Sequence, residues 1–360
     1  MKLKLKNTPE QIELVKAMGS KNMTEAREAQ EAFAAFLGPV VQQVLNQAGL
    51  AGAIYTDAPF DEDDSPSYPL DLYYGDSQNH VSVWQQGIAG GLPSSHVEGM
   101  AELKIATYRL DSAVNMLRKY ARRARLDVIS KAVERMSQEV LVKQERNAWA
   151  VLLKALSEGS TGGTAHTMDS TATGGVFQLD DMNRLMTHIR RLNESFASGT
   201  PDVAYSNGLT DLYMSPEMVE QVRGFAYQPM NTRAGAYTSA LKDSIALPDG
   251  VREDIYRSAG AQEIYGVSIN EMNELGAGKK YNTLYNSFGT DANELIIGLD
   301  NTKGAFIRPV AVQHESGGSF TTLADDQWSA RSEKIGFYGF LEEGRVCIDS
   351  RAVVGINVQA

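Results

Sequence analysis

The chain has 360 residues, 42% of them hydrophobic, so it can form two or three compact regions and is too apolar to be disordered throughout. Its 34 basic and 45 acidic residues give a net charge of -11, which argues against a surface that grips nucleic acid over most of its area. A single cysteine, Cys347, excludes an internal disulfide and argues against a zinc cluster, and no apolar stretch reaches the roughly 18 residues of a membrane span.

The first fifty residues predict one or two amphipathic helices. Thr24 is a candidate N-cap for the second helix, along which Phe33, Phe36 and Leu37 share one face. Pro39 either interrupts this helix or lies in its continuation. Such an arm has little core of its own, so we expect it to pack on something else.

Residues 57–67 read DAPFDEDDSPS, and their prolines and acidic run predict a solvated loop. A calcium site is the less favoured alternative. The run lacks the alternating aspartates, the glycine and the closing glutamate of a calcium-binding loop.

Two stretches with alternating apolar residues follow, at 80–86 and 100–110, and both are predicted to be strands. The connection between them, residues 87–99, is too long and too rich in Gly, Pro and Ser for a tight hairpin turn. We therefore expect an extended β-arm. Ordering such an arm on a lone subunit is costly in entropy, so we expect it to lie across a neighbour.

A long helix is predicted at 127–158, in a region without proline or glycine. Ile129, Val133, Met136 and Val140 are spaced by four, three and four residues, and the apolar stripe resumes after a polar interval at 143–147. At 1.5 Å per residue this helix is about 48 Å long. Gly159 is a suitable C-cap.

The rest of the chain predicts a mixture of helices and strands. A helix is expected at 179–196, and the sequence Ser215-Pro216-Glu217 is typical of a helix start. Strands are expected at 212–214, 263–270, 295–299 and 305–313, and a β-hairpin at 335–358.

No pattern for catalysis or cofactor binding stands out. The five histidines do not form the i, i+4 pair of a helical zinc site, and each is interpreted as an ordinary surface or strand histidine: His80, His96, His166, His188 and His314. Residues 274–281, ELGAGKKY, lack the first glycine and the final Ser or Thr of a phosphate-binding loop. The acidic pairs at 325–326 and 342–343 are interpreted as turns. We expect no enzyme activity, cofactor or metal.

One basic cluster lies between 118 and 125. On a helix Arg118, Arg122 and Arg125 would share one face and form a positive stripe. A solvated face, or a partner for acidic loops, is the plainer interpretation. The sharper one is a surface that forms inter-subunit salt bridges or faces DNA, because guanidinium groups bind carboxylates and phosphates bidentately.

The order of these elements resembles the major capsid proteins of tailed bacteriophages, which share the Hong Kong 97-type fold. HVSVWQQG and MAELKIATYRL resemble the E-loop and its return strand, and the 127–158 helix resembles the spine helix. DLYMSPEMVEQVRGF resembles the entry to the axial domain, and EIYGVSIN and the C-terminal strands resemble later axial and peripheral strands.

The resemblance implies an α+β fold with five parts. These are an N-terminal arm at 1–56, an E-loop at 57–110, a peripheral domain with the spine helix at 111–204, an axial domain at 205–310 and peripheral C-terminal strands at 311–360. The candidate E-loop contacts with a neighbour are Val83, Trp84, Leu103 and Ile105.

The resemblance also implies a function. Subunits would assemble as hexamers and pentamers into an icosahedral shell around double-stranded DNA, as part of a virion built in the host cytoplasm. The expected partners are the chain itself, a portal, a separate scaffolding protein and an optional decoration protein, with no membrane. Some family members join Lys and Asn covalently, but no matching motif surrounds Lys104 or Asn357.

Two alternatives remain open. An encapsulin-like nanocompartment shell has the same fold and encloses cargo enzymes, although such chains are usually shorter and have a less elaborate E-loop. A soluble metabolic enzyme with an unrecognised site is the alternative from a different class.

Overall fold

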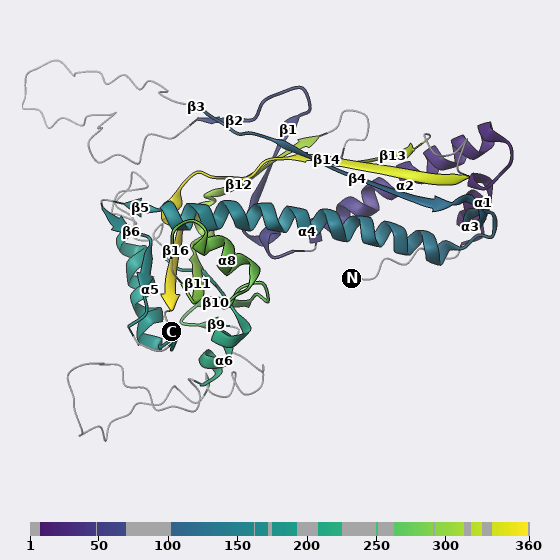
Figure 1. The fold of residues 1–360 in the computed structure, drawn as a ribbon. Helices are drawn as coiled ribbons and strands as arrows, with labels where there is room; N and C mark the ends of the chain where they lie inside the picture. The colour runs from purple at the N-terminus through teal and green to yellow at the C-terminus, as the bar shows by residue number, and fades with distance from the viewer. Residues whose placement is uncertain are drawn as a thin grey trace, which may run out of the picture. The chain divides into compact units, whose positions relative to one another are not determined.

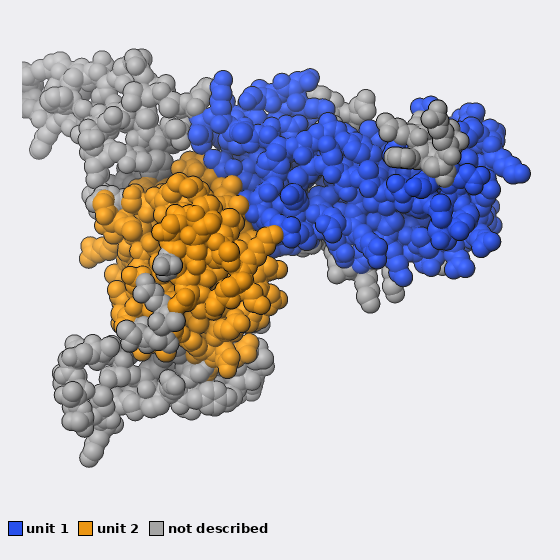
Figure 2. All heavy atoms as spheres, in the orientation of Figure 1, with its two compact units in different colours: residues 1–68, 102–148, 306–346 blue, residues 69–101, 149–305, 347–360 orange. Residues whose placement is uncertain are grey.

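The computed structural model describes residues 8–47, 49–69, 102–161, 163–171, 175–192, 208–224, 250, 263–290, 292–312, 318–325 and 333–358. The chain divides into two compact units (Figure 2). Unit 1 holds residues 1–68, 102–148 and 306–346, and unit 2 holds 69–101, 149–305 and 347–360. Both contain helices and strands, so the predicted α+β class is confirmed (Figure 1).

Unit 1 begins with a short helix, α1 (Pro9–Met18). The Thr8 side chain accepts a hydrogen bond from the backbone N–H of Gln11, and proline occupies the first helical position, where no N–H is needed. Gly19 ends the helix.

The second helix, α2 (Met23–Gln47), is the predicted arm helix. Its start differs from the expectation, because the Asn22 side chain accepts the N–H of Thr24 at 3.3 Å. Asn22 therefore caps the helix and Thr24 lies in its first turn. Pro39 lies inside α2, so the helix continues through it.

The sheet of unit 1 has the order β1-β12-β14-β13, with β4 paired to β14. Its strands are β1 (Thr56–Asp61), β12 (Phe306–Val312), β14 (Lys334–Glu343), β13 (Phe320–Asp325), β4 (Tyr108–Leu117) and the two-residue β15 (Val346–Cys347), which pairs with β12. β1 runs parallel to β12, whereas β4 and β13 run antiparallel to β14. The β4–β14 pairing extends from Tyr108 opposite Glu343 to Leu117 opposite Lys334.

Strand β1 corrects the prediction of a loop at 57–67. Residues 56–61 pair with 307–312, and a turn follows at Glu62–Asp64. Proline is tolerated here because β1 pairs with β12 alone among the described strands, so Pro59 can sit in an edge strand. Its acidic residues Asp57 and Asp61 are exposed.

The predicted β-arm is described only at its base. Strands β2 (Ser67–Pro69) and β3 (Glu102–Lys104) form a two-stranded sheet. The strand predicted at 80–86 and the connection at 87–99 lie outside the described residues. The continuous strand predicted at 100–110 is wrong: β3 ends at Lys104, and β4 begins at Tyr108 because Ile105 turns inward and is 7% exposed.

The long helix is confirmed as α4 (Leu126–Glu158), 33 residues without a break (Figure 1). A short helix, α3 (Arg118–Arg122), precedes it. Residues 126–148 of α4 belong to unit 1, and 149–158 belong to unit 2.

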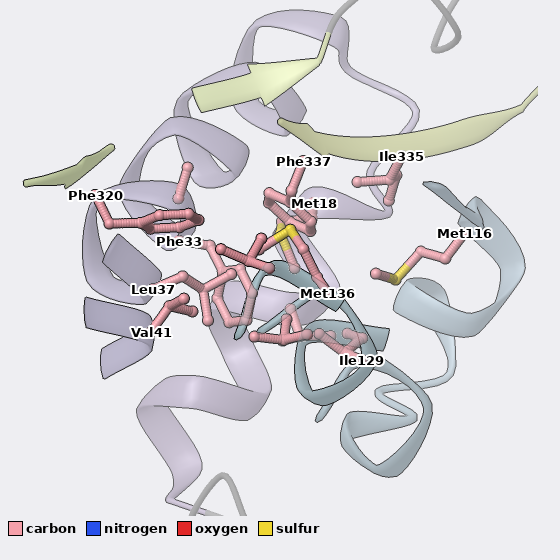
Figure 3. Packing of buried hydrophobic residues seen from close by; sticks show 14 of the residues in the cluster. Met18, Phe33, Leu37, Val41, Met116, Ile129, Met136, Phe320, Ile335 and Phe337 are labelled. Carbon is pink, nitrogen blue, oxygen red and sulfur yellow. The ribbon is translucent and has the colours of Figure 1, made fainter. Parts of the chain in front are cut away.

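The core of unit 1 lies between one face of its sheet and the helices α2 and α4 (Figure 3). Phe33 and Leu37 from α2 meet Phe337 from β14, and the rings of Phe33 and Phe337 are 5.4 Å apart. The predicted stripe of α4, Ile129 to Val140, joins them. Phe36 does not share this face: it is 44% exposed.

Unit 2 is built on a sheet of order β7-β16-β11-β8-β10-β9. The strands are β7 (Thr167–Asp169), β16 (Val353–Val358), β11 (Glu294–Leu299), β8 (Asp211–Met214), β10 (Val267–Glu271) and β9 (Glu263–Ile264). The remaining short elements are β5 (Ser160–Thr161), β6 (Thr164–Ala165) and the 3-10 turns Ala51–Ala53, Asn301–Lys303 and Ser350–Ala352.

The helices of unit 2 are α5 (Leu179–Leu192), α6 (Pro216–Gly224) and α8 (Lys280–Asn286). Ser215 caps α6 as predicted, since its Oγ accepts the N–H of Met218. The core contains Leu185 and Ile189 of α5, packed with buried residues of β8, β11 and β16.

Two strand predictions in unit 2 are wrong. The expected single strand at 263–270 is a tight hairpin of β9 and β10, which turns at Tyr265 and Gly266, both with positive φ. The expected hairpin at 335–358 does not form, because β14 and β16 belong to different sheets. All six residues of β16 are buried, which is typical of a central strand and unlike a hairpin with one solvated face.

Candidate assembly surface

The face of the unit 1 sheet that points away from α2 and α4 carries exposed side chains. Alternate residues of β4, from Arg109 to Leu117, are exposed, and Leu323 on β13 is 46% exposed. The intervening residues of β4 contribute to the core of unit 1. The strands therefore have one buried face and one outer face, following the period of two of a β-strand.

Four side chains on this outer face form a defined cluster: Arg109 and Asp111 of β4 with Tyr338 and Phe340 of β14. The Asp111 carboxylate accepts hydrogen bonds from Tyr338 Oη at 2.6 Å and from Arg109 Nε at 2.8 Å. Arg109 also donates to Tyr338 Oη, and its guanidinium lies 4.1 Å above the Phe340 ring. These bonds lower the pKa of Asp111, with the Tyr338 bond as the largest cause.

This outer-face cluster was missed by sequence reasoning. Arg109 and Asp111 are neighbours at a spacing of two on one strand, but their partners come from a strand 229 positions away. Arginine and tyrosine held in fixed geometry are typical of protein–protein contacts, because little side-chain entropy remains to be lost on binding. The arrangement suits recognition of another protein surface.

A buried carboxylate lies at the end of the same pair of strands. Glu343 has no exposed surface, and its two oxygens accept hydrogen bonds from four side chains: Tyr108 Oη at 2.8 Å, Gln144 Nε2 at 3.1 Å, Arg308 Nε at 2.7 Å and Arg345 Nη2 at 3.4 Å. The sequence prediction of a turn at 342–343 is wrong, since both residues close β14.

The Glu343 network joins β4, α4, β12 and β14. Burial, with the nearby Glu343 charge, raises the pKa of Tyr108 to about 12, so the phenol stays protonated and keeps donating. Arg308 also contacts Asp57 of β1 at 3.3 Å, and the Arg345 guanidinium lies 4.7 Å from the Tyr55 ring. These residues set the position at which β4 enters the sheet.

The predicted basic stripe is not a helix face. Helix α3 ends at Arg122, and Ala124 has a positive φ of 49°, so Arg125 does not share a helix with Arg118 and Arg122. Arg118 is 8% exposed and donates to the Ser20 carbonyl, and Arg122 donates to the Gly19 carbonyl at 2.8 Å. Both therefore hold the C-terminal end of α1, whereas Arg125 is exposed.

The candidate E-loop contacts fall partly outside the described residues, which do not include Val83 and Trp84. Leu103 is half-buried in β3. Ile105 is buried and lies close to Gly344, where an added Cβ would be 3.1 Å from its Cγ2. Ile105 is therefore a support of the loop base within its own unit.

Two histidines of unit 2 lie close to one another. His166 has no exposed surface, and its backbone bonds to Gly159 at the end of α4 and to Gly355 in β16. His188 of α5 bonds to the Ala165 carbonyl at 3.0 Å. Burial lowers the pKa of both rings. The prediction of an ordinary surface or strand histidine is wrong for the buried His166.

Among the described residues, no group of three or more His, Cys, Asp and Glu side chains is placed to hold a metal ion. None of the described helices is long and apolar enough to cross a membrane. Asn357, considered above for a covalent link, is 9% exposed, and its Oδ1 accepts a bond from Tyr285 Oη.

No protein-family model matches the chain, and no curated protein matches it. Solved structures do match. A chain of Gordonia phage Cozz is 15% identical, with a TM-score of 0.51 over 86% of each chain. A chain of Microbacterium phage Oxtober96 is 12% identical, with a TM-score of 0.50 over 86% of this chain and 91% of that one.

A chain from the capsid of the native GTA particle is 11% identical, with a TM-score of 0.51 over 85% of this chain and 89% of that one. At these identities the likeness concerns the fold. The chain has the fold of phage capsid proteins, and the resemblance inferred from the sequence is confirmed at this level.

Proposed function

We propose that this chain is a shell-building protein, the major capsid protein of a tailed bacteriophage. The observation that carries the proposal is the fold match, which extends over 85–86% of this chain and at least 86% of each of the three matched chains.

Subunits would assemble as hexamers and pentamers into an icosahedral shell. The outer-face cluster of unit 1 supports this assembly, because it offers a fixed polar and aromatic surface on a sheet that buries its other face. The extended arm expected between β2 and β3 would lie on a neighbour, with Val83 and Trp84 as its contacts and Leu103 at its base. Such interfaces should bury well over the roughly 1,600 Å² of a standard pair.

The proposed division into arm, E-loop, peripheral domain, axial domain and C-terminal strands keeps the boundaries given above. Helix α4 supports it as the spine, since it supplies buried residues to both compact units. Those boundaries place β16 among the C-terminal strands, although it pairs with β7 and β11 in the sheet of unit 2 rather than with β14.

The shell would enclose double-stranded DNA without reading its sequence. A net charge of -11 supports loose containment rather than tight wrapping. Within the predicted basic cluster, Arg125 and its neighbours Arg123 and Lys119 are exposed and could face DNA or a neighbouring subunit. A separate scaffolding protein, a portal and an optional decoration protein would be the partners, in a virion assembled in the host cytoplasm.

The test is to express the full chain, with its candidate scaffolding protein where a neighbouring gene encodes one, and to examine the purified material by negative-stain electron microscopy. We expect closed shells of uniform size. Shells from infected cells that protect DNA against nuclease support the phage function. Shells that instead retain an enzyme cargo would identify a nanocompartment, and small particles in every condition would contradict both.

A further inference from the structure

Strand β4 leaves one edge of the unit 1 sheet open. It has ten residues and pairs with β14 along its whole length, and in the part of the chain that the structure describes its backbone bonds to no other strand. The N–H and C=O groups along its second edge can therefore accept another strand. A long open edge without proline is a template for strand addition.

The opposite edge of this sheet is protected. Strand β1 has Pro59 in its middle and exposed carboxylates at Asp57 and Asp61, features that discourage the approach of another strand. Strand β4 has no proline, and its two charged residues, Arg109 and Asp111, are neutralised by each other. Strand β13 also pairs with β14 alone among the described strands, but it has six residues and packs against α2 through the 2.7 Å bond from Thr322 Oγ1 to the Ala34 carbonyl. Strand β4 is therefore the edge best suited to pairing.

The core-facing side of β4 is also incompletely covered. Leu110 and Val114 are half-buried, whereas Ile335, Phe337 and Leu341 of the adjacent β14 are about 1% exposed. An added strand with apolar residues on this side would extend the core over Leu110 and Val114. The added strand must therefore alternate apolar and polar residues with the same period as β4.

The first residues of the chain have this pattern. MKLKLKN places Leu3 and Leu5 on one side of an extended segment, and Lys2, Lys4 and Lys6 on the other. The segment precedes α1, which is capped at Thr8, so pairing it elsewhere would not disturb that helix. Its lysines would be attracted to the surface of a chain with net charge -11.

We propose that residues 2–6 of a second copy of this chain add antiparallel to β4 as an edge strand, with Leu5 opposite Ser112, Leu3 opposite Val114 and Lys4 opposite Ala113 on the outer face. A second copy is favoured by the reach of the chain. The C-terminal end of α1 is held beside α3 by Arg118 and Arg122, and α3 directly follows β4. In this register Lys6 lies opposite Asp111, about 20 Å along β4 from α3. Helix α1, about 15 Å long, and the two linking residues, about 7 Å, span that distance only if both run straight along β4.

Disulfide trapping tests the pairing and its register. In a Cys347→Ser background, the same-face pairs are Leu5→Cys with Ser112→Cys and Lys4→Cys with Ala113→Cys. The matched controls exchange the partners, so that the two thiols lie on opposite faces of the strands. After mild oxidation of assembled protein, non-reducing electrophoresis should show a ladder of linked subunits for the same-face pairs. The control pairs should show no ladder.

The outcomes separate this inference from the proposed function on which it rests. A ladder supports strand addition whether or not closed shells form. Closed shells without a ladder, or equal linking in both sets of pairs, overturn the inference and leave the proposed function standing. A link confined to single chains overturns it as well, since the occupant would then be the chain's own segment. If neither closed shells nor disulfide links form, both the inference and the proposed function are overturned.

Deleting residues 2–6 provides a second readout. The subunit should keep its far-ultraviolet circular dichroism spectrum, because α1 and its cap remain, but assembled particles should lose yield or stability relative to the full chain. A deletion variant that assembles like the full chain would also overturn the inference.

Discussion

Gln144 Nε2 donates a 3.1 Å hydrogen bond to Glu343 Oε2, across 199 positions of sequence. Both side chains are buried, at 4% and 0% exposure. This contact explains the polar interval that interrupts the apolar stripe of α4. Glu145, the next residue of α4 after Gln144, also has a specific partner, since its carboxylate accepts a hydrogen bond from the backbone N–H of Ala51. Gln144 and Glu145 therefore face partners that require them, whereas Lys143 and Arg146 of the same interval are exposed.

Replacing Glu343 should strongly destabilise unit 1. Glu343→Gln removes the charge that Arg308 and Arg345 share. Arg308 keeps the half-exposed Asp57 as an ion-pair partner, whereas the buried Arg345 guanidinium loses the one carboxylate that it contacts among the described residues. Breaking a buried ion pair in this way costs about 3–5 kcal/mol. Urea denaturation of the unassembled subunit, followed by circular dichroism, measures the change.

The control is the adjacent residue. Glu342 is half-buried and accepts one bond from Thr107 Oγ1 at 2.7 Å, so Glu342→Gln should cost about 1 kcal/mol. Equal losses for the two variants would contradict the account of the Glu343 network.

Replacing Arg118 should lower the stability of the subunit much more than replacing Arg125. Arg118→Met removes the bond to the Ser20 carbonyl that holds the end of α1, and should cost about 1–3 kcal/mol. Arg125→Gln alters an exposed side chain and should change the free energy of unfolding by less than about 0.5 kcal/mol. Thermal unfolding of both variants checks this, and a larger loss at Arg125 would contradict the structural role given to Arg118.

Acidification should weaken unit 2 through His166. Burial lowers the pKa of this ring below its usual 6.5, and the nearby charges of His188, Asp349 and Arg351 act less strongly. As the pH falls, His166 therefore binds a proton more readily in the unfolded chain than in the folded chain. The stabilisation is therefore complete above about pH 6.5 and falls as the pH drops, by at most about 1.4 kcal/mol per pH unit for each histidine.

The measurement is the free energy of unfolding between pH 7.5 and 5 for the wild type and for His166→Gln. The variant should have a shallower slope whatever its stability at pH 7.5. His188→Gln is a second comparison, because burial also lowers the pKa of His188. Identical slopes in all three proteins would rule out this origin of the pH dependence.

Cys347 should resist alkylation in the native subunit. Burial, with the charge of Asp349, raises its pKa to about 12, so the thiol stays protonated and unreactive at pH 8. Iodoacetamide at pH 8 should label the native protein slowly and the urea-unfolded protein quickly. A Cys347→Ser, Lys143→Cys protein, with an exposed thiol, controls for reagent activity, and rapid native labelling of Cys347 would contradict its burial.

Deleting residues 87–99 should leave a folded, soluble subunit that assembles poorly, because this stretch is expected to contact a neighbour. Circular dichroism tests folding, and sedimentation tests assembly. Normal shells from the deletion variant would refute the inter-subunit role of the arm.

The sequence predicted the elements whose patterns are local. The stripe from Ile129 to Val140 and the Ser215-Pro216 start of α6 depend on neighbours in the chain, and both are confirmed. The buried β11 and β12 were found for the same reason. The errors concern partners distant in sequence: β1 forms because β12 lies beside it, and β16 is a central strand because β7 and β11 flank it.

The candidate site was harder to predict, for a related reason. Arg308 is a lone charge in the apolar stretch AFIRPVAV, and that placement is the available signal of a buried partner. It could not identify Glu343 as the partner, since the residues meet through sheet topology. The outer-face cluster likewise depends on the register of Phe340 opposite Asp111.

The most direct test of the shell-building role is a cryo-electron microscopy reconstruction of the assembled protein. The account predicts a closed icosahedral shell in which copies of this chain form rings of five and six. A reconstruction showing discrete small oligomers, with β4 and the outer face of the unit 1 sheet exposed to solvent in every copy, would contradict it.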